Sequence, residues 1–587
     1  MTITDPDGKK RDITDPEKMG EALTKENRQK YHQTESTNPF MTSQLRQDFG
    51  EYGEGPQTKN LMSGTYIPPQ GLHNQTKDFL EVCKLPSKDI ETTLPCSVDE
   101  FTDSWKIAKE DTGTGTIHFG HFKAATSHKT NLLLHYALAE IPLRSGYTPS
   151  RWLQAANVMI LKKEGVTDID RLRTIVLFEA DFNQNNKFFG RKMMKHVQKH
   201  NLLAKEQYAV PGRKCIDHVI NRKLTFDIVR YQKMSLAMSS VDLKSCYDRI
   251  AHTPAYLAMR GFGIPHEPME SMFNTLQNIK HRAKTIHGLS KASFGGSEKG
   301  FKAKPNGQGQ GNGAAPPVWA IVSSRMFEIL TKRGLVTTFS RPISKQGLKI
   351  CGFAYVDDAD IIATSNSVND PEATIEIMQT TLDTWEAAAK ATGGALEPRK
   401  SYGYLVYFKW KNGTWSYGNI DNQTEMTAKD QNNTTVPLQM KASDEALNML
   451  GVHLAPDGNE EAQVKYMLKK AVQLGEYVRT GFVRREEAWI SLNSIALKVM
   501  EYPLPATTIS EKNLDSIMWQ LLQSYLPKAG INRRITRDVL YGSQTYQGLG
   551  LTNPFVLQTC RHFNDLAEHF HNDSITGELF KNSLKHL

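Results

Sequence analysis

Three aspartates could form a chemical centre in this chain. Asp357 and Asp358 are adjacent and lie between two apolar stretches, while Asp242 ends an earlier apolar stretch. Adjacent carboxylates repel one another unless a cation neutralises them. If the two stretches form a hairpin, the pair lies at its turn, and a neighbouring strand can bring Asp242 beside it. The three carboxylates would then bind two Mg²⁺ ions, or Mn²⁺, in the arrangement that serves nucleotidyl transfer.

The elements that must position these aspartates can be read from apolar periodicity and turn residues. Strands are predicted over residues 158–161, 172–177, 238–243, 350–356 and 360–364. A long helix is predicted to begin at Pro371 and to stop at Gly393, because proline favours the first helical turn and glycine the end. A charged helix is predicted over residues 17–33.

Several motifs occur in a fixed order around the aspartates. They are Arg173-Thr-Ile-Val-Leu177, Gln207-Tyr-Ala-Val-Pro-Gly-Arg213, Asp242-Leu-Lys-Ser-Cys-Tyr-Asp248, Gln310-Gly-Asn-Gly-Ala-Ala-Pro316, Tyr355-Val-Asp-Asp358, Gly394-Ala-Leu-Glu-Pro-Arg-Lys400 and Leu450-Gly-Val-His-Leu454. In these motifs the chain resembles reverse transcriptases, most closely those of non-LTR (LINE-type) retrotransposons. The resemblance covers roughly residues 140–460. The first motif departs from it, with threonine where the family has proline.

The resemblance implies how the incoming nucleotide would be bound. Tyr247 lies five residues after Asp242, where the family has an aromatic ring that excludes a ribose 2′-hydroxyl; the alternative is a core aromatic. Lys162 and Arg173 would hold the triphosphate, arginine in a bidentate manner and lysine as a point charge. Both could instead be surface charges.

Further roles follow for the remaining motif residues. Gln310 and Gly311 would let the backbone approach the template and the nucleotide, unless the glycine-rich segment is only a flexible loop. Tyr355 belongs to the same substrate site. Lys400 could protonate the pyrophosphate leaving group, or could simply be an exposed charge. Asp248 is expected to support the structure.

The fold expected from the resemblance is an α+β right-hand polymerase with fingers, a palm with an antiparallel sheet, and a helical thumb. The expected segments are an N-terminal extension of unknown role (1–115), fingers (116–235), palm (236–410), a polar insertion or loop (411–445), and a primer-grip segment with the helical thumb (446–587).

Composition agrees with a phosphate-rich partner. The formal net charge is +9 and the pI is near 8.9, which suits an RNA template, a DNA or RNA primer and dNTPs. The six cysteines form no C-x-x-C pair, so neither a disulfide framework nor a zinc knuckle is expected. No signal peptide or membrane-spanning stretch is visible, and a nuclear or cytoplasmic location is expected.

Two other functions stay open. An RNA-dependent RNA polymerase shares the palm, although it has no need of a bulky gate at Tyr247. A catalytically inactive nucleic-acid-binding relic of the fold would not need Asp242, Asp357 and Asp358 all intact. No motif of an endonuclease or ribonuclease H is recognised.

Overall fold

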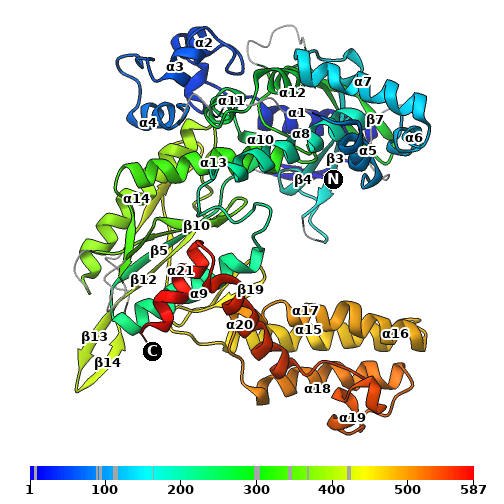
Figure 1. The fold of residues 1–587 in the computed structure, drawn as a ribbon, viewed down its shortest axis with the longest axis vertical. Helices are drawn as coiled ribbons and strands as arrows, with labels where there is room; N and C mark the ends of the chain where they lie inside the picture. Colours follow the sequence, from blue (N-terminus) through cyan, green and yellow to red (C-terminus); the bar gives the residue numbers. More distant parts are fainter. Residues whose placement is uncertain are drawn as a thin grey trace.

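The structure is a computed structural model that describes residues 1–586 apart from 5–8, 87–89, 91–95, 110–116, 163, 297–303, 341–346, 366–368 and 420–424. Helices and strands both contribute, and the expected α+β class is confirmed. Two larger sheets and a group of C-terminal helices dominate the molecule (Figure 1). Among the described helices, none has the length and apolarity needed to cross a membrane.

A five-stranded sheet carries the aspartates. Its strands, in spatial order, are β10 (Gly352–Tyr355), β11 (Asp358–Ala363), β5 (Leu236–Val241), β12 (Tyr402–Val406) and β17 (Gln439–Lys441). Neighbouring strands are antiparallel apart from the parallel pair β12–β17. Every residue of β5 is buried, Ser239 and Ser240 included, because β5 is a central strand with neighbours on both sides.

Helices cover both faces of this sheet. Ala237 of β5 belongs to an apolar cluster that includes α13 (Ala315–Lys332) and α14 (Pro371–Ala391). Met238, the next residue, belongs to a second cluster that includes α9 (Cys215–Gln232). The two residues point to opposite faces because side chains alternate along a strand. The helix predicted to begin at Pro371 is thereby confirmed.

A four-stranded sheet lies above the first one in Figure 1. Its order is β4 (Leu172–Leu177), β3 (Gln154–Leu161), β6 (Lys280–Thr285) and β7 (Gly288–Gly295). The predicted strands at 158–161 and 172–177 are confirmed. Strands β6 and β7 come from the segment expected in the palm, and α9 from the segment expected in the fingers. The expected boundary at residue 235 therefore does not separate the two sheets, because the chain crosses between them.

The N-terminal region is part of the same body. Helix α1 (Pro16–Tyr31) confirms the helix predicted there and packs against β6 and β7. Its N-terminus is capped by Asp15, whose side chain accepts a hydrogen bond from the Lys18 amide. Phe40 and Phe79 are buried in the main apolar cluster. Residues 1–115, expected as an extension of unknown role, thus contribute to the core in the part that the structure describes.

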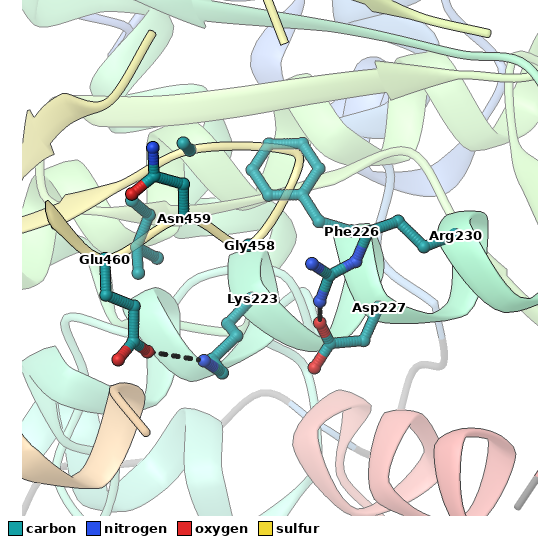
Figure 2. A pocket seen from close by; sticks show the side chains of 9 residues that line it. Lys223, Phe226, Asp227, Arg230, Gly458, Asn459 and Glu460 are labelled. Carbon is teal, nitrogen blue, oxygen red and sulfur yellow. Dashed lines mark hydrogen bonds and ion pairs between the residues drawn. The ribbon is translucent and has the colours of Figure 1, made fainter. Parts of the chain in front are cut away.

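The C-terminal helices form a lobe with its own core. Helices α15 (Glu461–Thr480) and α18 (Glu511–Lys528) pack together in a separate apolar cluster. The lobe is tied to α9 by the Lys223–Glu460 ion pair of 3.1 Å, drawn in Figure 2. The last helix, α21 (Ile575–Leu584), returns to pack on α9. The segment 446–587 therefore belongs to the lobe only in part.

Residues 411–445 were expected to form a polar insertion or loop, and part of the segment instead forms strands. It contributes to four strands besides β17: β13 (Phe408–Lys411), β14 (Thr414–Tyr417), β15 (Thr427–Lys429) and β16 (Thr435–Pro437). Hairpin β13–β14 projects from the end of the sheet, at the lower left of Figure 1. The Asn-Gly turn at 412–413 suits such a tight hairpin because both residues have positive φ.

Candidate active site

Strand pairing brings Asp242 and Asp358 together. Ala359 of β11 pairs with Val241 of β5 in antiparallel register, so the next position places Asp358 opposite Asp242. Residues directly opposite in such a pair have Cα atoms about 4.5–5.5 Å apart and side chains on the same face. Asp357 lies in the two-residue turn between β10 and β11. The three aspartates therefore meet at one end of the five-stranded sheet.

Burial, together with neighbouring negative charges, disfavours the ionised form of these carboxylates. Asp358 is exposed at the sheet end, yet partial desolvation by the surrounding protein and the charges of Asp357 and Asp242 raise its pKa to about 6. Desolvation also raises the pKa of Asp242; the Lys400 ammonium opposes this shift and Asp357 adds to it. Carboxylate oxygens with unbalanced negative charge suit a hard divalent cation.

The carboxylates are not gathered into a ready-made metal site. Within the residues that the structure describes, no three His, Cys, Asp or Glu side chains meet closely enough to hold a metal ion. The donor chemistry of Asp242, Asp357 and Asp358 fits Mg²⁺, but binding would require some of these side chains to change rotamer. Two of the three lie at or beside a hairpin turn, where the exposed side chain of Asp358 has room to move.

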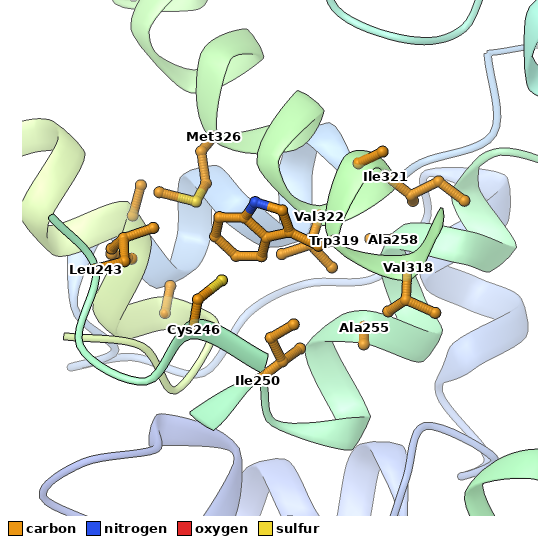
Figure 3. Packing of buried hydrophobic residues seen from close by; sticks show 14 of the residues in the cluster. Leu243, Cys246, Ile250, Ala255, Ala258, Val318, Trp319, Ile321, Val322 and Met326 are labelled. Atoms are coloured by element: carbon orange, nitrogen blue, oxygen red, sulfur yellow. The ribbon is translucent and has the colours of Figure 1, made fainter. Parts of the chain in front are cut away.

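Side chains from distant segments hold that turn. Val356 has a φ of +59°, which β-branched residues rarely adopt. The Trp319 indole donates to the Val356 carbonyl at 2.6 Å, and the Val356 amide donates to Gln207 Oε1 at 3.3 Å. Figure 3 shows the Trp319 ring among apolar side chains that include Cys246 and Met326. Backbone strain persists only where its surroundings over-determine it, and here it lies beside the carboxylates.

A buried ionic network anchors β11 two residues after Asp358. Asp360 is fully buried and accepts a hydrogen bond from Arg222 at 3.1 Å, while His218 Nε2 lies 3.0 Å from its other oxygen. Both partners are on α9. Burial by itself raises the pKa of Asp360, but Arg222 and His218 lower it below its usual range. These contacts join the β10–β11 hairpin to α9.

The backbone of Asp242 is held by the segment that leads into β12. The Glu397 amide donates to the Asp242 carbonyl at 2.9 Å, and the Asp242 amide donates to Ser401 Oγ at 3.0 Å. Lys400 Nζ lies 3.7 Å from Asp242 Oδ2 and its side chain is 61 % exposed. The ammonium can therefore move between the carboxylate and a bound anion.

Lys162 and Arg173 approach the same place from the four-stranded sheet. Arg173 is an exposed residue of β4, and Lys162 directly follows β3. The charge of Arg173 lowers the pKa of Asp357, although burial raises it overall. Burial lowers the pKa of Lys162, and the cations Lys400, Lys30 and Arg173 add to this effect. Carboxylates of one sheet thus face cations of the other.

Tyr247 and Tyr355 lie beside the carboxylates. Tyr247 is half-buried on the short helix α10 (Cys246–Arg249). Burial raises its pKa, and the charges of Cys246, Asp357 and Tyr355 contribute, which shows that the ring is close to the hairpin. Tyr355 is half-buried and pairs with Asp358 across β10 and β11.

The glycine-rich loop before α13 lies against β4. The Val176 amide donates to the Gln310 carbonyl at 2.7 Å. Gly311 has a φ of +128°, and a Cβ there would lie 2.2 Å from the Val176 oxygen, so only glycine fits. Gln310 is half-buried, whereas Gln308, two residues earlier, is buried and its backbone amide donates to the Tyr247 carbonyl at 2.7 Å.

Sequence reasoning missed two residues of this site, Lys30 and Tyr31, both at the end of α1. Tyr31 donates to Asp248 Oδ1 at 3.1 Å. Lys30 is close enough to Lys162 and Asp248 to influence the pKa of each. The only available signal was the helix predicted over 17–33, which contains no motif that relates it to residue 248.

Comparison with known families agrees with this geometry. The chain belongs to the reverse transcriptase (RNA-dependent DNA polymerase) family, whose model matches residues 160–454, just over half of its length. The matched region includes all three aspartates. Membership supports a polymerase-type nucleotidyltransferase that uses an RNA template, a primer and nucleotides. No curated protein matches the chain significantly.

Proposed function

We propose that this protein is an RNA-directed DNA polymerase of a retroelement of the non-LTR type. The five-stranded sheet is its palm, the four-stranded sheet with α1 its fingers, and the C-terminal helical lobe its thumb. One observation carries the proposal: Asp242 and Asp358 lie opposite each other on adjacent strands, with Asp357 at the turn and Arg173 opposite. A site with carboxylates on one side and a cationic side chain on the other can bind a nucleotide triphosphate and its counterions.

Each side chain of the site has a separate role in nucleotidyl transfer. Lys162 and Arg173 bind the triphosphate, Arg173 with a planar guanidinium that suits phosphate oxygens. The ring of Tyr247 lies under the sugar and leaves no room for a 2′-hydroxyl. Lys400 gives a proton to the leaving pyrophosphate, since its exposed ammonium lies beside Asp242.

Asp242, Asp357 and Asp358 would hold two Mg²⁺ ions, and Mn²⁺ could replace them. Bound there, the ions supply the charge that makes the primer 3′-hydroxyl nucleophilic and neutralises pyrophosphate. The strained turn and the Asp360 network keep the hairpin in place while the carboxylates turn toward the ions. Positioning and charge neutralisation then account for most of the rate enhancement.

Primer extension tests this function. Purified protein should extend oligo(dT) on poly(rA) with dTTP and Mg²⁺, and should stop when the metal is chelated. An enzyme that extends only with ribonucleotides would instead be an RNA-dependent RNA polymerase. Binding of the template–primer without any extension, under conditions where the protein is folded, would identify an inactive relic.

A further inference from the structure

The N-terminal helix α1 ends inside the proposed nucleotide site, a region to which no motif assigns it. We propose that residues 30–33, the end of α1 and the two residues after it, are a specificity-determining part of this polymerase, in which Tyr31 positions the sugar-selecting residue Tyr247. The inference rests on the proposed function and identifies a positioning residue outside the matched family region, which begins at residue 160.

The first link joins Tyr31 to the helix that carries Tyr247. The Tyr31 hydroxyl donates to Asp248 Oδ1 at 3.1 Å, and the two residues are 2 % and 4 % exposed. Asp248 also accepts a hydrogen bond from the Gln310 amide. Burial raises the pKa of Asp248 to about 6, and the bond from Tyr31 opposes this shift. The hydroxyl therefore stabilises a charged carboxylate next to Tyr247, which a buried site would otherwise disfavour.

The second link joins α1 to the glycine-rich loop. The Asn306 amide donates to the Tyr31 carbonyl at 2.8 Å. Two residues later, the Gln308 amide donates to the Tyr247 carbonyl at 2.7 Å. Tyr31, Tyr247 and the start of the loop are thus connected by main-chain hydrogen bonds, so a shift of one moves the others.

The third link reaches the segment before Lys400. Gln33 is 5 % exposed, and its amide nitrogen donates to the carbonyls of Arg249 and Gly393, the second at 3.2 Å. Arg249 directly follows Asp248 on α10. One side chain of the N-terminal segment therefore spans α10 and the end of α14.

The Tyr31 ring is fixed independently of its hydroxyl. It stacks on His281 and Phe294 of the four-stranded sheet, with ring centroids 5.7 and 5.9 Å away. Loss of the hydroxyl should therefore leave the ring and α1 in place and remove one donor from Asp248. We expect α10 to gain freedom at residues 247–248, and the gap below the incoming sugar to widen enough for a 2′-hydroxyl.

The test is Tyr31→Phe, measured as the ratio of dNTP to rNTP incorporation on the same template–primer. We expect the preference for dNTP to fall about 2- to 10-fold, the factor that one hydrogen bond commonly represents, and to fall by more than kcat for dNTP does. Tyr256→Phe is the matched control: its buried hydroxyl is 2.7 Å from His266 Nδ1, in a different contact of the same body. This control should lower the melting temperature without changing the ratio.

The outcomes separate the inference from the function on which it rests. If the wild type extends DNA and Tyr31→Phe changes only the melting temperature, as the Tyr256 control does, Tyr31 is structural and the inference is overturned. If the wild type extends no primer, the proposed function fails and the inference with it. Gln33→Ala is the second variant: a changed ratio there, without loss of fold, supports the same role for the segment.

Discussion

At the scale of single residues, the chief feature is three carboxylates at one end of the five-stranded sheet, Asp242, Asp357 and Asp358. Burial raises the pKa values of Asp242 and Asp358, and the charges of the neighbouring carboxylates add to the shift. A protein keeps such an arrangement stable by local anchoring, and here Asp360 and its partners on α9 supply it. The cost of repulsion is removed when cations bind, so removal of one carboxylate should affect catalysis far more than folding.

Asp358→Asn should abolish primer extension and leave RNA binding largely intact. The substitution removes one charged oxygen donor from the proposed metal site, whereas the cations that bind phosphates remain. Primer extension and RNA binding at moderate salt measure the two effects. Asp383→Asn, an exposed aspartate of α14, is the control. A loss of RNA binding equal to the loss of synthesis would contradict this division of roles.

Tyr247→Ala should relax sugar selection more than it lowers dNTP incorporation. In the proposed site the Tyr247 ring occupies the space that a ribose 2′-hydroxyl would need. Removing the ring should therefore remove the steric penalty against ribonucleotides. The opposing interpretation is a core tyrosine, whose truncation would cost about 3–5 kcal/mol of stability. Incorporation ratios and melting curves of the purified variant decide between them. An unchanged ratio with a large fall in melting temperature would refute the gate role.

Sequence patterns located the aspartates because the spacing of motifs reflects local strand and turn geometry. The pairing of Asp242 with Asp358 was foreseeable, since each ends or begins an apolar strand. Tyr31 was not, because its contact with Asp248 joins residues 217 positions apart and a tyrosine at a helix end has no distinctive pattern. The positive φ of Val356 could not be predicted either, because valine rarely adopts a left-handed backbone conformation.

At the scale of elements, helix α7 (Lys129–Ser145) illustrates how packing changes a titratable residue. His135 lies among the rings of Phe101, Trp105 and Phe122, with centroids 4.7–5.0 Å away. Neither ring nitrogen has a hydrogen-bond partner among the described residues. Burial lowers its pKa to about 4. His135 is therefore a neutral core side chain at pH 7.

His135→Phe should make the protein less sensitive to acid. The unfolded chain takes up a proton near pH 6.5, whereas folded His135 resists it to about pH 4. Stability is therefore full above pH 6.5 and falls as the pH drops toward 4, by roughly 2 kcal/mol at pH 5. The difference in melting temperature between pH 8 and pH 5 should shrink in the variant. The exposed His128→Phe should leave that difference unchanged.

Helices and strands were predicted correctly where a local run of apolar or turn residues marked them. They were missed where the surrounding sequence is mostly polar. The strand over 172–177 and the helix from Pro371 followed from apolar runs and from turn residues. Hairpin β13–β14 was hidden by its polar neighbours, although Trp410 and Trp415 pair across it with centroids 5.1 Å apart. The tryptophan pair stabilises this two-stranded hairpin, although the polar residues around it are not typical of strands.

At the scale of the whole molecule, the chain repeatedly leaves a sheet and returns to it. Strands β6 and β7 rejoin the four-stranded sheet more than a hundred residues after β3 and β4, and α21 returns to α9 after the whole C-terminal lobe. Expected boundaries at 235 and 446 assumed that each body is continuous in sequence. Long-range returns of this kind leave no periodic signal, so the sequence could not reveal them.

Leu579→Ala should destabilise the sheet-bearing body and not only the C-terminal lobe. Leu579 of α21 is fully buried in the cluster with α9, and such truncations cost about 2–5 kcal/mol. Leu584→Ala, five residues further along the same helix, is 41 % exposed and should cost little. Thermal unfolding of both variants measures the contrast. Equal melting temperatures would show that α21 contributes nothing to that body.

The placement of α1 has a further consequence for how the protein is made. The helix is synthesised early, but the partner of Tyr31 at its end, Asp248, follows 217 positions later. Gly393, the partner of Gln33 just after the helix, follows 360 positions later. At a synthesis rate of about 5–20 residues per second, these partner residues are made roughly tens of seconds after the helix. The polymerase site can therefore be completed only late in translation. Pulse-labelled chains should acquire protease resistance near Tyr31 only after residue 306, its last hydrogen-bond partner along the chain, has left the ribosome.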